Sequence, residues 1–135
     1  MRMSPARLLI IDEHDAVRQA LKARLNAADG LDVVGCTGCW KIGLQEAVAK
    51  RPDVVLLETK RTDGQGLEAL RCLAERCPAT SLFVLTTYPD ADERDEALRV
   101  GAVRYVLKEI DTPQLVREIE AILRPDASLL RRQES

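Results

Sequence analysis

Five short apolar runs alternate with five longer segments of helical periodicity, and this alternation constrains the fold more than any other feature. The apolar runs lie at 7–11, 31–36, 54–57, 81–86 and 104–107. The periodic segments lie at about 17–28, 40–50, 66–77, 90–100 and 112–123. Strict alternation of strands and helices favours a parallel sheet covered on both faces. With right-handed crossovers, this predicts a doubly wound α/β domain whose site lies outside the carboxyl ends of the strands.

The chain of 135 residues fits one domain. We assign residues 1–124 to that domain and 125–135, where the periodicity stops, to a tail or the start of a linker. The formal net charge of −2 gives no reason to expect direct nucleic-acid binding by this segment. The apolar runs are too short to cross a membrane, and Asp12 interrupts the first run too early for a signal peptide. A cytoplasmic location is therefore expected.

Four cysteines raise the question of a metal or redox site. Cys36 and Cys39 belong to the sequence CTGC, which fits a redox pair or half of a zinc site completed by Cys72 and Cys77. The second pair, however, lies within a predicted helix, where Cys77 shares the apolar face with Leu73. Ordinary thiols in a reducing compartment are the favoured interpretation.

Two aromatic or titratable side chains in the first half of the chain have alternative interpretations. His14 follows an acidic pair and fits either a phosphodonor or metal ligand, or a residue at the start of a helix. Trp40 begins the second helical segment, where it fits either an exposed interface anchor or a partly buried contact. In that segment the apolar residues include Ile42, Ala47 and Val48.

Polar side chains follow the carboxyl ends of four of the predicted strands. Asp12 and Glu13 follow the first strand, Glu58 the third, Thr86 ends the fourth and Lys108 follows the fifth. Carboxylates brought together repel one another unless a cation joins them, and hard oxygen ligands of this kind suit Mg²⁺. A lysine and a hydroxyl at the same place could hold phosphate oxygens. The set predicts a phosphoryl-transfer site built on a carboxylate.

Several segments of the chain resemble the receiver domain of bacterial two-component response regulators, in particular the NarL/FixJ type. The segments are LLIIDEHDAVRQAL, RPDVVLLE, GLEALRCL, LFVLTTY and GAVRYVLKE, and the resemblance extends from Arg7 to Leu123. It implies a flavodoxin-like, CheY-like sheet of five parallel strands in the order 2-1-3-4-5. It also implies phosphate transfer from a histidine kinase to an aspartate at the end of the third strand.

The resemblance implies a role for each residue at the strand ends. Asp12 and Glu13 match the acidic pair that positions Mg²⁺. Glu58 occupies the phosphoacceptor position, and the residue at this position is also a ligand of the metal in the family. The backbone carbonyl of Lys60 matches the third protein ligand of the metal.

Three further residues match the part of the family's site that senses phosphate. Thr86 matches the hydroxyl that follows the phosphoryl group, and Tyr105 matches the aromatic switch residue. Lys108 matches the lysine that binds the phosphate.

The chain departs from the family at the acceptor itself and in the loop behind it. Glu58 stands where the family has aspartate, Arg61-Thr62 stand in place of Met-Pro, and Gln65-Gly66 in place of Asp-Gly. Lys108 is followed by Glu109 instead of proline, so a trans peptide is expected there. The extra methylene moves the carboxylate outward by about 1.3 Å. A displacement of about 1 Å can cost on the order of a hundredfold in rate, so Glu58 is expected to be a poor acceptor.

Three functional interpretations follow. The favoured one is a phosphate-independent receiver, not an enzyme, that acts by protein interaction or dimerisation, with Glu58 paired to Lys108 and accepting from Thr86. Its Mg²⁺ site would be weak or absent. A homodimer would form through the fourth helix, fifth strand and fifth helix, or through the first and fifth helices. The DADERDE run at 90–96 would be a solvated face or would set pairing specificity.

The second interpretation is a receiver of a transcription regulator that still accepts phosphate with Mg²⁺, on Glu58 or on Asp63, from a histidine kinase or another signalling partner. The third is a phosphatase that uses the same carboxylates. Phosphatases of the haloacid dehalogenase class need an Asp-x-Asp pair after the first strand, which Asp12-Glu13-His14 does not supply.

Overall fold

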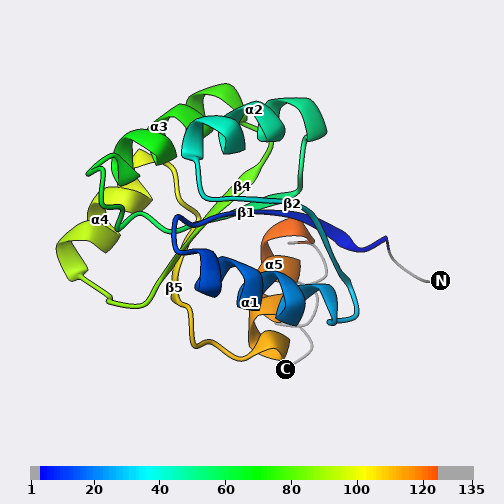
Figure 1. Cartoon of the computed structure of the whole chain (residues 1–135). Helices are drawn as coiled ribbons and strands as arrows, with labels where there is room; N and C mark the ends of the chain where they lie inside the picture. The colour runs from blue at the N-terminus through cyan, green and yellow to red at the C-terminus, as the bar shows by residue number, and fades with distance from the viewer. Residues whose placement is uncertain (1–3, 125–135) are drawn as a thin grey trace, which may run out of the picture.

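The computed structural model describes residues 4–124, in which five strands and five helices alternate (Figure 1). The elements are β1 (Ala6–Ile11), α1 (Asp15–Asn26), β2 (Leu31–Thr37), α2 (Trp40–Lys50), β3 (Val54–Leu57), α3 (Gly66–Arg76), β4 (Ser81–Thr86), α4 (Ala91–Val100), β5 (Arg104–Leu107) and α5 (Thr112–Leu123). The expectation of a tail at 125–135 lies outside the described residues. No helix in the described part of the chain combines the length and apolar character that crossing a membrane requires.

All five strands are parallel and lie in the order β2-β1-β3-β4-β5, which confirms the predicted doubly wound sheet. The chain runs from β1 outward to β2 and then crosses back to β3, so the strand order reverses between β1 and β3. In this kind of sheet the crevice at the reversal is the usual site. Ile11 pairs with Leu57, so β1 and β3 end at the same level, whereas β4 continues to Thr86, beyond the partner of Leu57. This register brings the residues after β1 and β3 side by side.

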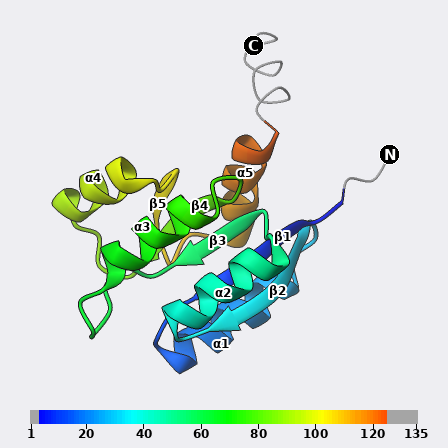
Figure 2. The same cartoon turned by 90° about the horizontal axis from the view of Figure 1, so that it is seen from above.

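The side chains of each strand alternate between two separate cores. Leu9 and Ile11 point to the core under α2, α3 and α4, whereas Leu8 and Ile10 point to the core under α1 and α5. Figures 1 and 2 show the same division, with α2, α3 and α4 on one side of the sheet and α1 and α5 on the other. Nearly continuous apolar strands are what a sheet covered on both faces requires.

Capping residues determine where the last two helices begin. The Asp90 side chain accepts from the Glu93 N–H at 3.0 Å, and the Asp111 side chain accepts from the Gln114 N–H at 2.8 Å. Pro113 lies in the first turn of α5, where no N–H is needed. These contacts satisfy donors that a helix N-terminus leaves free, and they confirm the predicted helix starts.

Two of the three apolar residues noted in the second predicted helix do not face the sheet. Ile42 and Val48 are exposed, and the residues turned to the sheet are Trp40, Gly43 and Ala47. A Cβ at position 43 would lie 2.4 Å from the Ile11 side chain, so glycine lets α2 approach β1 closely. The Trp40 indole is buried and donates to the Gln65 side chain at 2.9 Å, which confirms the buried alternative.

All four cysteines are free thiols. Cys77 is buried in the core, as predicted, and burial raises the pKa of the Cys36, Cys72 and Cys77 thiols. Within residues 4–124 no group of His, Cys, Asp and Glu side chains is arranged to hold a metal ion. The geometry therefore does not support the zinc alternative.

Candidate functional site

Two buried carboxylates, Asp12 and Glu58, lie next to each other at the reversal point of the sheet. Each directly follows a strand, and the Glu58 N–H donates to the Ile11 carbonyl at 3.0 Å, which extends the pairing of β1 with β3 to this level. Asp12 is 1% exposed and Glu58 is 4% exposed. Buried carboxylates at adjacent strand ends are costly unless cations or hydrogen-bond donors compensate them.

The compensating cation is the Lys108 ammonium group. Its Nζ lies 2.5 Å from Asp12 Oδ2 and 3.1 Å from Glu58 Oε1, and the lysine side chain is only 10% exposed. The Lys108 N–H donates to the Thr86 carbonyl at 2.8 Å, which places the lysine just beyond the end of β5. The predicted contact between Glu58 and Lys108 is confirmed. The peptide after Lys108 is trans, as no cis peptide occurs in the described residues.

Backbone donors occupy the remaining oxygens of the two carboxylates. The Lys60 N–H donates to Glu58 Oε2 at 3.2 Å. The His14 N–H donates to Asp12 Oδ1 at 3.0 Å, and the His14 ring Nδ1 lies 3.2 Å from the same oxygen. His14 is exposed at the start of α1, in agreement with the helix-start alternative. Each oxygen of Asp12 and Glu58 therefore has a partner within the chain.

Glu13 does not join this cluster. Its Oε1 accepts from the Thr62 N–H at 2.6 Å and its Oε2 accepts from the Thr62 hydroxyl at 3.0 Å. The Arg61 guanidinium is 4.0 Å from Glu13 Oε2. The loop after β3 therefore holds the Glu13 carboxylate through Thr62.

Thr86 is fully buried at the end of β4, but its hydroxyl is engaged locally. Its Oγ1 lies 3.4 Å from the Tyr88 carbonyl and accepts from the Tyr88 N–H at 3.3 Å. The expected hydrogen bond from Thr86 to Glu58 is therefore wrong in this conformation. The hydroxyl closes the turn after β4 because both of its partners are only two residues away.

A divalent cation does not fit this arrangement of side chains. Mg²⁺ prefers carboxylate, phosphate and water oxygens in near-octahedral geometry. Here the oxygens of Asp12 and Glu58 already accept from Lys108, Lys60 and His14, and Glu13 is bound to Thr62. The metal-ligand roles expected of Asp12, Glu13, Glu58 and the Lys60 carbonyl stay predictions.

A second polar cluster, centred on Glu93 of α4, adjoins the site. Glu93 Oε1 accepts from the Thr59 hydroxyl at 2.7 Å and from the Tyr105 hydroxyl at 3.2 Å. Glu93 Oε2 pairs with the Lys60 ammonium at 3.0 Å, and the Asp90 N–H donates to the Tyr105 oxygen at 3.2 Å. The hydrogen bond to Glu93 raises the pKa of Lys60, and burial, followed by the Glu93 charge, raises the pKa of Tyr105.

The sequence pattern did not indicate Glu93, because the charged run at 90–96 suggested a solvated face. Its place three residues after Asp90 fits a capping box, but the Asp90 N–H donates to Tyr105 and Glu93 binds Thr59, Lys60 and Tyr105 instead. Two of the residues joined to Glu93 directly follow Glu58 in the sequence. The cluster therefore connects the acceptor strand to α4 and β5.

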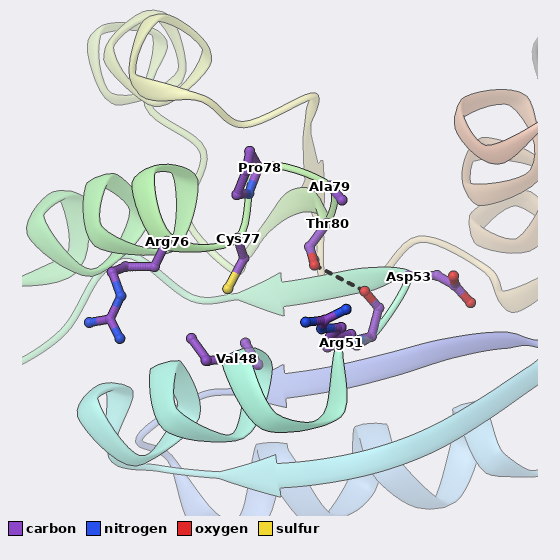
Figure 3. A pocket seen from close by; sticks show the side chains of 10 residues that line it. Val48, Arg51, Asp53, Arg76, Cys77, Pro78, Ala79 and Thr80 are labelled. Carbon is purple, nitrogen blue, oxygen red and sulfur yellow. Dashed lines mark hydrogen bonds between the residues drawn. The ribbon is translucent and has the colours of Figure 1, made fainter.

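A separate pocket lies at the opposite end of the strands from the carboxylate site, next to the amino ends of β3 and β4 (Figure 3). It has a volume of about 410 Å³ and is lined by the ends of α2 and α3, including Arg51, Arg76 and Cys77. The Thr80 hydroxyl there donates to the Pro52 carbonyl at 3.0 Å. Basic side chains at helix C-termini are expected from the helix dipole, so the arginines alone do not indicate a ligand.

Comparison with known families identifies the domain. The family model for the response regulator receiver domain matches residues 8–120. The DNA-binding transcriptional activator DevR/DosR of Mycobacterium tuberculosis is 34% identical over 116 residues, which are 86% of this chain and 54% of that protein. The oxygen regulatory protein NreC of Staphylococcus carnosus is 30% identical over 121 residues, which are 89% of this chain and 56% of that protein.

A solved structure agrees with the observed topology. The receiver domain of the response regulator NarL from Mycobacterium tuberculosis superposes with a TM-score of 0.78 at 20% identity, covering 87% of this chain and 94% of that one. The chain spans about half the length of the curated relatives it matches. This chain belongs to the response regulator receiver domain family, and NarL/LuxR-type regulators are among its relatives.

Proposed function

We propose that this receiver domain acts in two-component signalling without phosphate, as a module for protein interaction or dimerisation. The observation that carries the proposal is the Lys108 ammonium held between Asp12 and Glu58. In this position the lysine has a permanent anionic partner inside the chain. A phosphoryl group is therefore not needed to supply one.

The geometry around Glu58 also argues against efficient phosphate acceptance. In-line phosphoryl transfer needs a carboxylate oxygen that is free and aligned with the donor phosphorus. One oxygen of Glu58 accepts from Lys108 and the other from the Lys60 N–H. Glu58 carries one negative charge, whereas a phosphoryl group carries nearly two and has three acceptor oxygens, so Glu58 can imitate it only in part.

We place the interaction surface on α4, β5 and α5, with the α1/α5 surface as the alternative for a homodimer. The Glu93 cluster supports the first location, because it joins the strand end at Thr59 and Lys60 to Tyr105 of β5. The partner would be a histidine kinase, another signalling protein or a second copy of the chain, in the cytoplasm. The relative DevR/DosR is named for DNA binding, but the net charge of this segment, −2, does not support direct DNA contact here.

A receiver that still accepts phosphate is the second candidate, since Asp12, Thr86 and Lys108 are all present at the strand ends. In that case Glu58 or Asp63 would be the acceptor. The Asp63 carboxylate accepts from the Gln65 N–H at 2.9 Å and from Arg61, in the loop beyond the Lys108 cluster. Asp63 is therefore less well placed than Glu58 for contact with the lysine.

Intact-mass spectrometry after incubation with acetyl phosphate or phosphoramidate and Mg²⁺ tests the proposal. We expect no phosphoryl adduct on the wild-type domain, while a phosphate-accepting receiver treated in parallel gains one. An adduct that disappears in Glu58→Gln or in Asp63→Asn would establish the second candidate and identify its acceptor. Turnover of p-nitrophenyl phosphate with Mg²⁺ is expected to be absent, and measurable turnover would favour a phosphatase.

A further inference from the structure

The loop between β3 and α3 contains an arginine that is almost completely buried. Arg61 is 5% exposed along its side chain, although it lies only three residues beyond Glu58 in a surface loop. Its Nη2 donates to the Gly38 carbonyl at 3.0 Å, and its Nε lies 3.2 Å from an Asp63 carboxylate oxygen. A buried guanidinium is stable only when acceptors or anions surround it; here Nε and Nη2 have such partners, whereas the buried Nη1 has no hydrogen-bond partner among the described residues.

The loop is closed tightly enough to keep that charge next to the acid pair. A Cβ on Gly66 would lie 1.6 Å from the Thr59 carbonyl oxygen, so the two ends of the loop touch and only glycine fits there. Within the closed loop, Thr62 donates both its N–H and its hydroxyl to Glu13, and Arg61 lies 4.0 Å from the same carboxylate. Thr62 therefore fixes Glu13 through hydrogen bonds and Arg61 supplies the charge.

Cations of the chain itself offset part of the negative charge at the site. The three carboxylates Asp12, Glu13 and Glu58 face two buried cations, Lys108 and Arg61. Lys108 pairs with Asp12 and Glu58. Arg61 lies near Glu13 and donates to the Gly38 carbonyl in the loop after β2. Arg61 also pairs with Asp63 at 3.2 Å, so the two cations offset part of the acidic charge.

We propose that the Arg61 guanidinium is a resident cation that replaces a divalent metal ion at the acid pair and excludes Mg²⁺ from it. Arg61, which also pairs with Asp63, places positive charge 4.0 Å from Glu13, and Thr62 occupies both Glu13 carboxylate oxygens with hydrogen bonds. The acid pair therefore cannot provide two adjacent free carboxylates. The inference rests on the proposed function and explains why the site would not respond to Mg²⁺ or to Mg²⁺-dependent phosphodonors.

Titration of the domain with Mg²⁺ tests the inference. Binding is measured by calorimetry and by the fluorescence of Trp40, the single tryptophan. Trp40 is suitable as a reporter because it lies two residues from Gly38 and is buried against Gln65. We expect no saturable binding by the wild-type domain up to about 20 mM, well above the range of weak oxygen-ligand sites. Arg61→Met removes the charge and retains an apolar chain, and it should bind Mg²⁺ at least about tenfold more tightly, saturating within this range.

Arg71→Met is the matched control, because Arg71 is an exposed arginine of α3 that pairs with Glu68 and Glu75, away from the acid pair. This variant should behave as the wild type does. Saturable binding by the wild-type domain, or the absence of binding by a folded Arg61→Met variant, would overturn the inference.

A measurement on the unaltered domain covers the case in which Arg61→Met fails to fold. Paramagnetic Mn²⁺ should leave the amide resonances of Asp12, Glu13 and Glu58 unbroadened, and selective broadening there would refute the resident-cation role. The outcomes also separate this inference from the proposed function. A wild-type domain that binds Mg²⁺ but gains no phosphoryl adduct contradicts only the role of Arg61, whereas an adduct contradicts the phosphate-independent function itself.

Discussion

Replacement of Lys108 by methionine is the most direct test of the arrangement at the strand ends. Methionine has nearly the same length as the lysine stem but no charge, so it fills the space and removes the ammonium group. The two carboxylates that lose their cation, Asp12 and Glu58, are each no more than 5% exposed along the side chain. They would then be left buried beside each other with a net repulsion.

The size of the effect follows from the two distances. At an effective dielectric constant of about 20, unit charges 3.1 Å apart attract by about 5 kcal/mol and those 2.5 Å apart by about 7 kcal/mol. Desolvation of the three groups offsets most of this attraction in the wild type. Removing one partner exposes that penalty, which typically costs about 3–5 kcal/mol. Since small domains have a total stability of about 5–15 kcal/mol, Lys108→Met should be strongly destabilised.

Equilibrium urea unfolding of a double-mutant cycle measures this interaction. Glu58→Gln alone should lose less stability than Lys108→Met, because the amide can still accept from the Lys60 N–H and Lys108 keeps Asp12. The double variant Glu58→Gln/Lys108→Met should be more stable than the sum of the single losses implies, by about 1–3 kcal/mol. Lys22→Met, at an exposed position of α1, controls for loss of one surface lysine.

Two results would refute this reasoning. A loss below about 1 kcal/mol in Lys108→Met would mean that the lysine behaves as an exposed ion pair does. Additive losses in the cycle would mean that Glu58 and Lys108 do not interact in solution, and the proposed function would lose the contact on which it rests.

Two further predictions concern the region around α4. Glu93→Gln should lower the pKa of Tyr105, because the charge and hydrogen bond of Glu93 add to burial in raising that pKa. Titration of tyrosinate absorbance measures the pKa, and an unchanged value would contradict the contact between Glu93 and Tyr105. Asp90→Ala should be less stable than the wild type at neutral pH, because its carboxylate caps α4 and its pKa is lowered mainly by the Glu93 N–H. A carboxylate whose pKa is lower in the folded state stabilises the protein at pH values above its unfolded pKa, which for Asp90 is 3.8. The difference in stability between Asp90→Ala and the wild type should therefore disappear on acidification below that pH. Thermal unfolding across this pH range measures the difference, and a difference that persists would contradict the capping role of Asp90.

The sequence predicted the elements well because the physical signals for them are local. Each strand contains a short run of apolar residues, and proline, glycine or an N-cap aspartate lies at or just beyond an end of α2, α3, α4 and α5. The apolar residues of α2 did not indicate which side of the helix is buried, because that side depends on how closely the helix approaches the sheet. Gly43 permits that close approach, and the helix then turns Trp40 inward and leaves Ile42 at the surface.

For the site, sequence reasoning succeeded where backbone position alone decides the outcome. Asp12 and Glu58 meet because they follow β1 and β3, adjacent parallel strands of matched register, and the long Lys108 side chain reaches them from the end of β5. The orientation of Glu13 and the connections of Glu93 depend on side-chain conformations and loop closure. Those features depend on partners distant in the sequence, such as Thr62 for Glu13, which strand and helix periodicity does not encode.

Three consecutive residues at the end of β3 connect the candidate site to the α4–β5 surface. Glu58 contacts Lys108, while Thr59 and Lys60 both contact Glu93, and Glu93 in turn accepts from Tyr105. Because these contacts begin on consecutive residues directly after β3, the position of Glu58 and the position of α4 are not independent. Lys108 and Lys60 each pair with a carboxylate of the chain itself, Glu58 and Glu93. An α4–β5 surface fixed in this way needs no incoming phosphoryl group to hold it, which is the physical basis for proposing a receiver that signals by its presence and its partners instead of by phosphorylation.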